Sequence, residues 1–164
     1  MDLAIAESLS ERMRTAFRGY PTGVAVITAA GPVGLTASSV ASVSVAPPVL
    51  SFSVMGTGSG KALLAAESFV VHLLGPRQVG VARDFARSGG PRFTDEQGWS
   101  VLASGEPVLP DAVAALRCTP LHLLAVGDST LVVAAVTDVF HGPADGPLVH
   151  HARTFVTSAL TDRV

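Results

Sequence analysis

The sequence predicts a mostly β protein, an antiparallel barrel or sandwich with a few short helices. Two observations predict this class, and a third predicts what fills its core. Short runs rich in β-branched residues follow one another along the chain, and turns containing glycine and proline separate them. Helical spacing recurs in only three short segments, too few for a doubly wound sheet with a helix after nearly every strand. Aromatic residues make up 5% of the chain, so we expect a core of mainly Val, Ala and Leu.

The first segment predicts a helix over about residues 8–18. Apolar residues recur in it at the spacing of one helix face. Ser8 followed by Glu11 fits a capping box, in which each residue bonds the backbone N–H of the other. Gly19 and Pro21 then end the helix.

The strands follow from the β-branched runs and the turns between them. We expect them at Val24–Thr28, Val33–Thr36, Val40–Val45, Val49–Val54, Phe69–Leu74, Val113–Val126, Thr130–Phe140 and Leu148–Phe155. The turn Gly127–Ser129 joins the two longest strands into a hairpin. Two more short helices are expected over Lys61–Glu67 and Gln78–Arg87, and a loop over Ser88–Ser100.

Length and charge limit the possible organisation and partners. The 164 residues predict one domain over residues 1–164, with the β region at about 20–157 after the first helix. The net charge of −2 without a basic stripe argues against a nucleic-acid partner. No charged residue lies between Gly19 and Gly60, but prolines and glycines break this stretch into strands rather than a membrane helix. We therefore expect a soluble, cytoplasmic protein without a membrane partner.

A glycine-rich segment, Gly56–Lys61, resembles nucleotide-binding loops without matching them. For a P-loop the first glycine would fall at Met55, and Ala62 lacks the hydroxyl that binds the metal ion. The GxGxG spacing also fails the dinucleotide fingerprint. A glycine-serine loop that leads into a helix still presents backbone N–H groups to an anion, and Lys61 is the only lysine. A flexible strand-to-helix turn is the alternative.

The histidines and the single cysteine predict neither a metal site nor a catalytic residue. His150 and His151 are adjacent on an expected strand, so they point to opposite faces and make a poor chelate. Two alternatives remain: one of these histidines faces a ligand, or both lie on the surface. Cys118 is expected to be a small buried hydrophobe. We assign no catalytic side chain, as expected if a cofactor carries the chemistry.

An ordered set of short motifs runs along nearly the whole chain, from about Phe17 to Phe155. The motifs are Phe17–Thr28, Gly34–Ser44, Pro47–Pro48, Phe69–Leu74, Gln78, Ala82–Phe85, Arg92–Phe93, Gly105–Leu109, Leu116–Cys118, Gly127–Asp128 and Pro147–Leu148. In order and spacing this set resembles the flavin reductase-like, FMN-binding split-barrel family. It is most similar to the small reductase components of two-component flavin monooxygenases.

The resemblance implies a fold and an activity. The fold would be an antiparallel split β-barrel of Greek-key type, assembled as a homodimer with the flavin near the subunit interface. The activity would be that of an NAD(P)H:flavin oxidoreductase, with NADH or NADPH as hydride donor. Such an enzyme would supply reduced FMN or FAD to a separate flavin-dependent monooxygenase.

The resemblance also implies which residues bind the cofactors. Residues matching the family's flavin ring segment are Val33, Thr36, Ala37, Ser38 and Ser39. Those matching its phosphate region are Ser53, Val54, Thr57, Ser59 and Lys61, and Phe85 matches a residue beside the flavin tail. Ser129, His150, His151 and Arg153 match positions near the nicotinamide nucleotide.

Two departures from the family pattern keep other functions open. Many members have histidine where this chain has Ser129, and a basic residue where it has Gly58. The first departure motivates the alternative of a flavin-binding module without NAD(P)H oxidation. Binding of a tetrapyrrole or of another flavin-like ligand is a third possibility, although the absence of a metal-ligand cluster disfavours haem.

Overall fold

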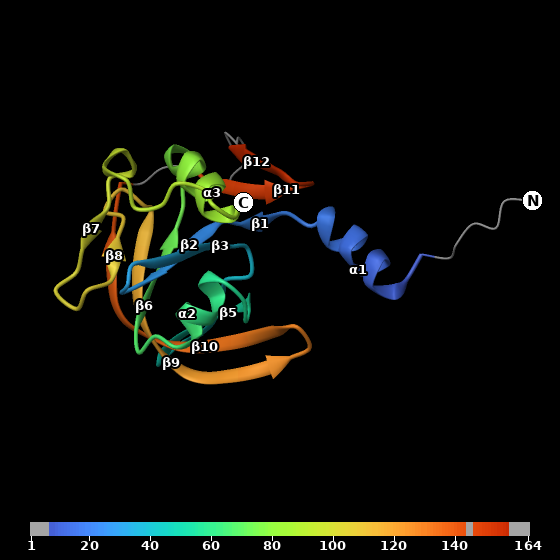
Figure 1. Ribbon diagram of the computed structural model, residues 1–164, viewed down its shortest axis with the longest axis horizontal. Coiled ribbons are helices and arrows are strands. Elements are labelled where there is room, and N and C mark those ends of the chain that lie inside the picture. Colours follow the sequence, from blue (N-terminus) through green and yellow to red (C-terminus); the bar gives the residue numbers. More distant parts are fainter. Residues whose placement is uncertain (1–6, 144–145, 158–164) are drawn as a thin grey trace, which may run out of the picture.

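The computed structural model describes residues 7–143 and 146–157 and is built mainly from antiparallel strands (Figure 1). The strands are β1 (Thr22–Gly23), β2 (Ala25–Ala29), β3 (Val33–Ala37), β4 (Ala41–Val45), β5 (Pro48–Met55), β6 (Phe69–Leu73), β7 (Ser100–Val101), β8 (Pro107–Val108), β9 (Ala114–Val126), β10 (Ser129–His141), β11 (Leu148–His151) and β12 (Thr154–Thr157). A seven-stranded sheet has the order β3-β2-β6-β9-β10-β5-β4. Small sheets β1-β11-β12 and β7-β8 accompany it. The predicted mostly β, antiparallel class is confirmed.

Short helices connect the strands. They are α1 (Leu9–Arg18), α2 (Ser59–Leu64) and α3 (Val79–Ala86), with single turns η1 (Pro76–Gln78) and η2 (Asp95–Gln97). The predicted capping box of α1 is present, since Ser8 N donates to Glu11 Oε2 at 2.8 Å and Glu11 N donates to Ser8 Oγ at 3.2 Å. None of the residues of α1 is buried, and the helix extends away from the sheet beyond β1 (Figure 1). In the described part of the chain, no helix has the length and apolar character needed to cross a membrane.

The large sheet curls, so that its β3 edge approaches β5. Strand β4 pairs with β5 only as far as Ser51, which leaves Ser53 beyond the paired segment. Ser39, just after β3, accepts a hydrogen bond from Ser53 N at 3.0 Å and donates to Ser53 O at 3.3 Å. These two bonds tie together strands that lie near opposite ends of the sheet order.

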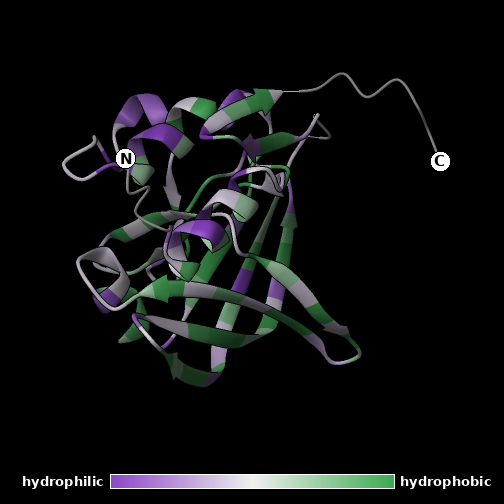
Figure 2. Ribbon diagram, turned by 90° about the vertical axis from the view of Figure 1, so that its right-hand side faces the viewer, coloured by the Kyte–Doolittle hydropathy of each residue, from purple (hydrophilic) through white to green (hydrophobic). Residues whose placement is uncertain are grey.

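Apolar residues on the strands form the core, and Figure 2 shows that they dominate the sheet. The main cluster packs inside the curl and includes Ile27, Leu50, Phe52, Val54, Phe69, Val71, Cys118 and Val132. The rings of Phe52 and Phe69 meet edge to face at 5.3 Å. Cys118 is fully buried, as predicted, and burial raises the pKa of its thiol to about 12. The thiol is therefore an inert core group.

A second cluster packs α3 against the other face of β2 and β3. Phe85 of α3 meets Phe93 and Trp99, with ring centroids 5.1 and 5.4 Å apart. Gly34 is required here, because an added Cβ would lie 2.5 Å from the Phe85 ring. The absence of a side chain at Gly34 therefore lets Phe85 pack directly against β3.

His72 on β6 is a buried structural residue. Its Nδ1 lies 2.9 Å from Val26 O, and its Nε2 accepts a hydrogen bond from Leu109 N at 3.1 Å. Burial lowers the pKa of His72 to about 4, so the imidazole is neutral and its Nδ1–H donates to Val26. The ring links three segments of the core.

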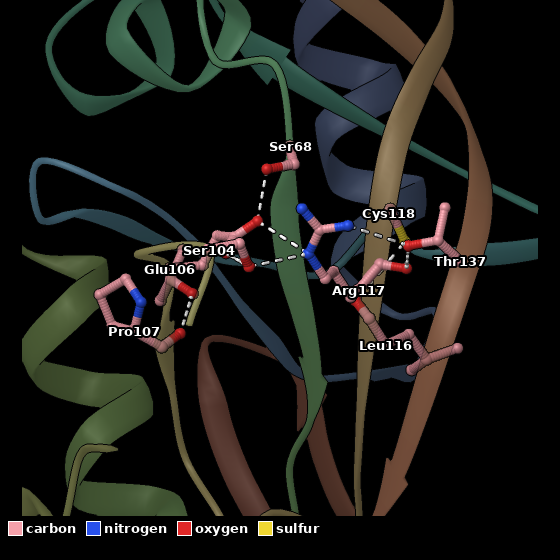
Figure 3. A network of polar contacts seen from close by, with 9 residues as sticks. Ser68, Ser104, Glu106, Pro107, Leu116, Arg117, Cys118 and Thr137 are labelled. Carbon is pink, nitrogen blue, oxygen red and sulfur yellow. Dashed lines mark hydrogen bonds and ion pairs between the residues drawn. The ribbon is translucent and has the colours of Figure 1, made fainter. Parts of the chain in front are cut away.

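A buried polar network fastens the turn between β7 and β8 to the large sheet (Figure 3). The carboxylate of Glu106 accepts hydrogen bonds from the hydroxyls of Ser68 and Ser104, and from Arg117 Nε at 3.0 Å. Burial acts to raise the pKa of Glu106, but these hydrogen bonds and the Arg117 charge outweigh it and lower the pKa. The network is structural, because every buried charge in it is paired.

Three sequence expectations need correction. The helix expected over Lys61–Glu67 begins two residues earlier, at Ser59, and ends at Leu64. The single strand expected over Leu148–Phe155 is a hairpin of β11 and β12, turned at Ala152 and Arg153. The region expected as a plain loop over Ser88–Ser100 contains the 3₁₀ turn η2 and the start of β7.

Candidate functional site

The first candidate site is a cavity of about 710 Å³ beside the place where β3 approaches β5. Four segments line it: the end of β3, the end of β5, the loop into α2, and the end of α3 with the loop that follows. The lining residues include Thr36, Ala37, Ser38, Ser39, Ser53, Val54, Met55, Thr57, Gly58, Ser59, Gly60, Phe85, Arg87 and Arg92. The cavity volume lies within the ~300–1,000 Å³ typical of small-molecule sites.

The wall formed by the end of β3 consists of small residues, and two of its hydroxyls are already bonded within the protein. Thr36 Oγ1 donates to Ala82 O of α3 at 2.7 Å. Ser39 Oγ is held by the backbone of Ser53. Ala37 and Ser38 lie between them, and Ser38 is exposed. Because its side chains are small and Ser38 is exposed, this wall allows a flat ligand to approach the backbone closely.

The loop from Met55 to Gly60 is shaped by its glycines. Gly58 has a φ of 54°, a conformation that favours glycine, and precedes the first residue of α2. Gly60 is buried, and an added Cβ would lie 2.0 Å from Met55 O. The loop consequently folds back on β5 and places Thr57 and Ser59 on the cavity wall. Hydroxyls and backbone N–H groups at such a turn suit an anion.

Two arginines supply positive charge at this cavity. Arg92 is fixed, because its guanidinium donates to the carbonyl oxygens of Gly90, Phe85 and Arg87 at 3.1 to 3.2 Å. It also lies over the Phe85 ring, 5.4 Å from the centroid. Arg87 is more exposed, with a side chain 62% exposed and Nη2 3.4 Å from Asp84 Oδ1. The hydrogen bonds of Arg92 thus fix the backbone of the segment that carries Arg87.

A second cavity of about 730 Å³ adjoins the first. Ser38 and Ser39 line both of them. The second cavity lies between α1, β1 and the turn from β11 to β12, and its lining includes Arg14, Phe17, Arg18, Tyr20, His150 and Arg153. The two cavities therefore share a wall just after the end of β3.

Comparison with known proteins decides the family. The sequence matches the flavin reductase like domain over residues 17–159. The chain belongs to this family. It is 47% identical over 147 residues to the NADH:FMN oxidoreductase of Rhodococcus erythropolis, across 84% of this chain and 76% of that protein. The predicted family resemblance is confirmed.

Solved flavin reductases share the fold. The NADH:FAD oxidoreductase of Streptomyces globisporus, solved in complex with NAD and FAD fragments, is 31% identical with a TM-score of 0.86, covering 95% of this chain and 98% of that one. The flavin reductase component of a bacterial two-component tryptophan halogenase is 30% identical with a TM-score of 0.82, covering 94% and 99%.

Within this flavin reductase fold, most of the residues predicted for flavin contact line the first cavity. They are Thr36, Ala37, Ser38, Ser39, Ser53, Val54, Thr57, Ser59 and Phe85. Val33, at the start of β3, and Lys61 are not among its lining residues. Lys61 is exposed on α2. The sequence analysis did not assign Arg87 and Arg92 to the flavin site, because their position at the first cavity depends on how α3 packs.

The residues predicted near the nicotinamide nucleotide separate into three places. His150 and Arg153 line the second cavity, whereas His151 is exposed on the opposite face of β11. Ser129 begins β10, where it pairs with Met55 of the first cavity, and its hydroxyl donates to Asp128 Oδ1 at 3.1 Å. The sequence analysis missed Arg14 and Arg18, which reach the second cavity from the far end of the chain.

The residues of the first cavity suit a flavin nucleotide. Its small-residue wall leaves space for a planar ring, and the loop Thr57–Gly60 with Arg87 offers donors and charge for a phosphate. Arg92 Nε is buried and has no hydrogen-bond partner among the residues that the structure describes.

Proposed function

We propose that this protein is an NADH-dependent flavin reductase that acts on FMN or FAD. The observation that carries the proposal is the first cavity, which combines a small-residue wall, a hydroxyl-rich glycine loop and arginine charge in a chain of the flavin reductase family. Relatives named NADH:FMN oxidoreductase and NADH-dependent FAD reductase support the donor and both acceptors.

The protein's own residues would act by binding and positioning. The backbone and small side chains of Ala37 and Ser38 would lie along the flavin ring edge, and Phe85 would pack near the flavin tail. Thr57, Ser59 and Arg87 would hold the phosphate. When bound there, flavin would supply the hydride acceptor and NADH the hydride donor, and the protein would contribute by holding the two together. The hydride step needs no acid or base from the protein, in agreement with the lack of an assigned catalytic residue.

We further propose a homodimeric split barrel of Greek-key type, forming a single domain. The approach of the end of β3 to β5, which are not neighbours in the sheet order, supports the split barrel. Exposed apolar side chains support a dimer: Leu9 and Met13 on α1 are 78% and 61% exposed, and Leu124 on β9 is 57% exposed. The proposed location is the cytoplasm, where NADH is supplied. The proposed consumer of reduced flavin is a separate flavin-dependent monooxygenase, and structural neighbours named as the flavin reductases of a styrene monooxygenase and of a two-component halogenase support this.

Steady-state oxidation of NADH and NADPH, each with FMN, FAD or riboflavin added, tests the activity. The proposal predicts turnover with NADH and FMN or FAD well above the rate without protein. Turnover no faster than the uncatalysed reaction for every pair would reject the reductase. Tight flavin binding in the same preparation would then leave the non-reducing flavin-binding module.

A further inference from the structure

The guanidinium of Arg92 binds the backbone that leaves α3. Its Nη2 donates to Phe85 O and to Arg87 O, both at 3.2 Å, and its Nη1 donates to Gly90 O at 3.1 Å. All three acceptors are main-chain carbonyl oxygens. Because both terminal nitrogens are bonded in this way, the side chain of Arg92 determines the course of the backbone between Phe85 and Gly90.

These bonds satisfy groups that the end of α3 leaves without a partner. The last carbonyl groups of a helix have no acceptor role within the helix and carry partial negative charge, so a cation beside them is favourable. Phe85 belongs to the last turn of α3. Arg92 also lies over the Phe85 ring, so one side chain fixes both the ring and the backbone. The planar guanidinium can bond several carbonyl groups at once, whereas a lysine ammonium lacks this geometry.

Two glycines let the segment after α3 turn back on the helix. Gly89 has a φ of 71°, a conformation that favours glycine. An added Cβ at Gly90 would lie 2.2 Å from Asp84 O of α3, so the backbone passes the helix too closely for a side chain. Gly90 N also donates to Arg87 O at 3.3 Å. The segment from Arg87 to Gly90 is therefore a tight turn against α3, and the hydrogen bonds of Arg92 close it.

This tight turn forms one wall of the first cavity, because Arg87, Ser88 and Gly89 all line it. Apart from Arg92 itself, Arg87 carries the only cationic side chain among the described residues that line the cavity. The Arg87 side chain is largely exposed, and its contact with Asp84 is long, so its own side-chain contacts do not fix its place. The backbone of Arg87 is instead held by the hydrogen bond that its carbonyl oxygen accepts from Arg92.

We propose that Arg92 is a positioning residue for the phosphate of FMN, and that it acts through Arg87 rather than on the phosphate. By holding the carbonyl oxygens on both sides of Arg87, it keeps the Arg87 guanidinium at the cavity wall. The inference rests on the proposed function, because it requires a flavin phosphate beside Thr57 and Ser59. Direct contact between Arg92 and the phosphate is the alternative, since Arg92 Nε has no hydrogen-bond partner among the described residues.

A double-mutant cycle on the purified full-length protein tests the proposal through flavin binding, without any turnover. The variants are Arg92→Met, which keeps an apolar stem over Phe85 but has no donor, Arg87→Ala, and the two combined. Each single variant should raise the Kd for FMN roughly two- to fivefold and leave the Kd for riboflavin unchanged, and the double variant should raise the Kd for FMN no further. Arg92→Lys, which restores a cationic donor, should recover part of the affinity. The matched control is Arg83→Met, exposed on α3 and outside the cavity lining, which should bind both flavins normally.

Cleavage by trypsin gives a second measurement that needs no flavin. The protease can cut the peptide bond after Arg87 only when this segment opens away from α3. Arg92→Met should therefore speed this cleavage several-fold, whereas Arg83→Met should leave its rate unchanged. The masses of the fragments identify the bond that is cut.

The outcomes separate the positioning role from the alternatives. Losses of FMN affinity that multiply in the double variant would show that Arg92 binds the phosphate itself, and would overturn the proposal. An equal loss for FMN and riboflavin in Arg92→Met, or unchanged cleavage after Arg87, would also overturn it. Wild-type protein that binds no FMN, or Arg87→Ala that binds it normally, would reject the phosphate site and this inference together. The expected coupling in a protein that does not oxidise NADH would uphold the role of Arg92 and reject the reductase activity instead.

Discussion

Replacing Arg87 by alanine is expected to weaken FMN binding while riboflavin binding changes little. Arg87 lines the first cavity together with Thr57 and Ser59 of the glycine loop. FMN carries a phosphate that riboflavin lacks, so only FMN would lose a charged partner. The resemblance had pointed to Lys61 for this charge, but Lys61 is exposed on α2 and is not among the lining residues.

The expected size of the effect follows from the exposure of Arg87. A hydrogen bond to a charged group contributes ~1.5–3 kcal/mol when it is well shielded. The Arg87 side chain is 62% exposed and already lies 3.4 Å from Asp84, so water and this carboxylate both reduce the contribution. Exposed ion pairs contribute at most about 1 kcal/mol. The Kd for FMN should therefore rise roughly two- to fivefold.

Quenching of flavin fluorescence by wild type and variant gives both affinities in the same buffer. Lys61→Ala is the matched control, since it removes a cation next to the cavity without changing its lining, and it should leave both affinities unaltered. An equal loss for FMN and riboflavin in Arg87→Ala would mean that Arg87 acts on the fold. No change for FMN, with a loss in Lys61→Ala, would return the phosphate charge to Lys61.

Three further predictions concern other parts of the molecule. Ser38→Leu should lower flavin affinity roughly five- to 150-fold, because overfilling a packed site costs ~1–3 kcal/mol. Equilibrium dialysis with flavin measures the affinity, and the control variant is Ser42→Leu, which is exposed on β4 and outside the cavity lining. Normal flavin binding by Ser38→Leu would refute the proposed position of the flavin ring. Ser129→His should raise kcat/KM for NADH about tenfold if an imidazole here orients the nicotinamide, which corresponds to ~1.4 kcal/mol of transition-state stabilisation. An unchanged kcat/KM would place this turn outside the nicotinamide site. The free energy of unfolding should fall by at most ~1.4 kcal/mol per pH unit as the pH drops from about 6.5 towards 4, because His72 binds a proton in the unfolded chain but stays neutral when it is buried. Urea unfolding of His72→Gln should show a smaller fall, and an equal fall in the variant would mean that other groups cause the pH dependence.

The sequence predicted correctly those elements whose conformation is determined by neighbouring residues in the chain. The capping box at Ser8 and Glu11 and the hairpin turn at Gly127 both appear in the structure as expected. In each case the residue types themselves favour one backbone conformation. The turn at Ala152 and Arg153 was missed for the opposite reason, because neither residue favours the positive φ that it adopts.

The flavin cavity was predicted largely through the family motifs, and the rest of the site depends on tertiary packing. Ser39 and Ser53 meet only because the sheet curls. Arg92 lines the same cavity as the glycine loop because its guanidinium is bonded to the carbonyl oxygens of Phe85 and Arg87 at the end of α3. Arg14 and Arg153 are separated by nearly the whole sequence, and the pairing of β1 with β11 and the hydrogen bond from Ala152 N to Arg18 O bring their segments together. No periodicity or motif in one sequence encodes such long-range contacts.

The central claim is that this chain transfers hydride from NADH to a flavin held in the first cavity. The most direct measurement is the absorption spectrum of the purified protein mixed with FMN, before and after NADH is added without oxygen. The account predicts that the flavin absorbance bleaches quickly, and that Ser38→Leu slows the bleaching. Bleaching no faster than in a mixture of FMN and NADH without protein would contradict the claim.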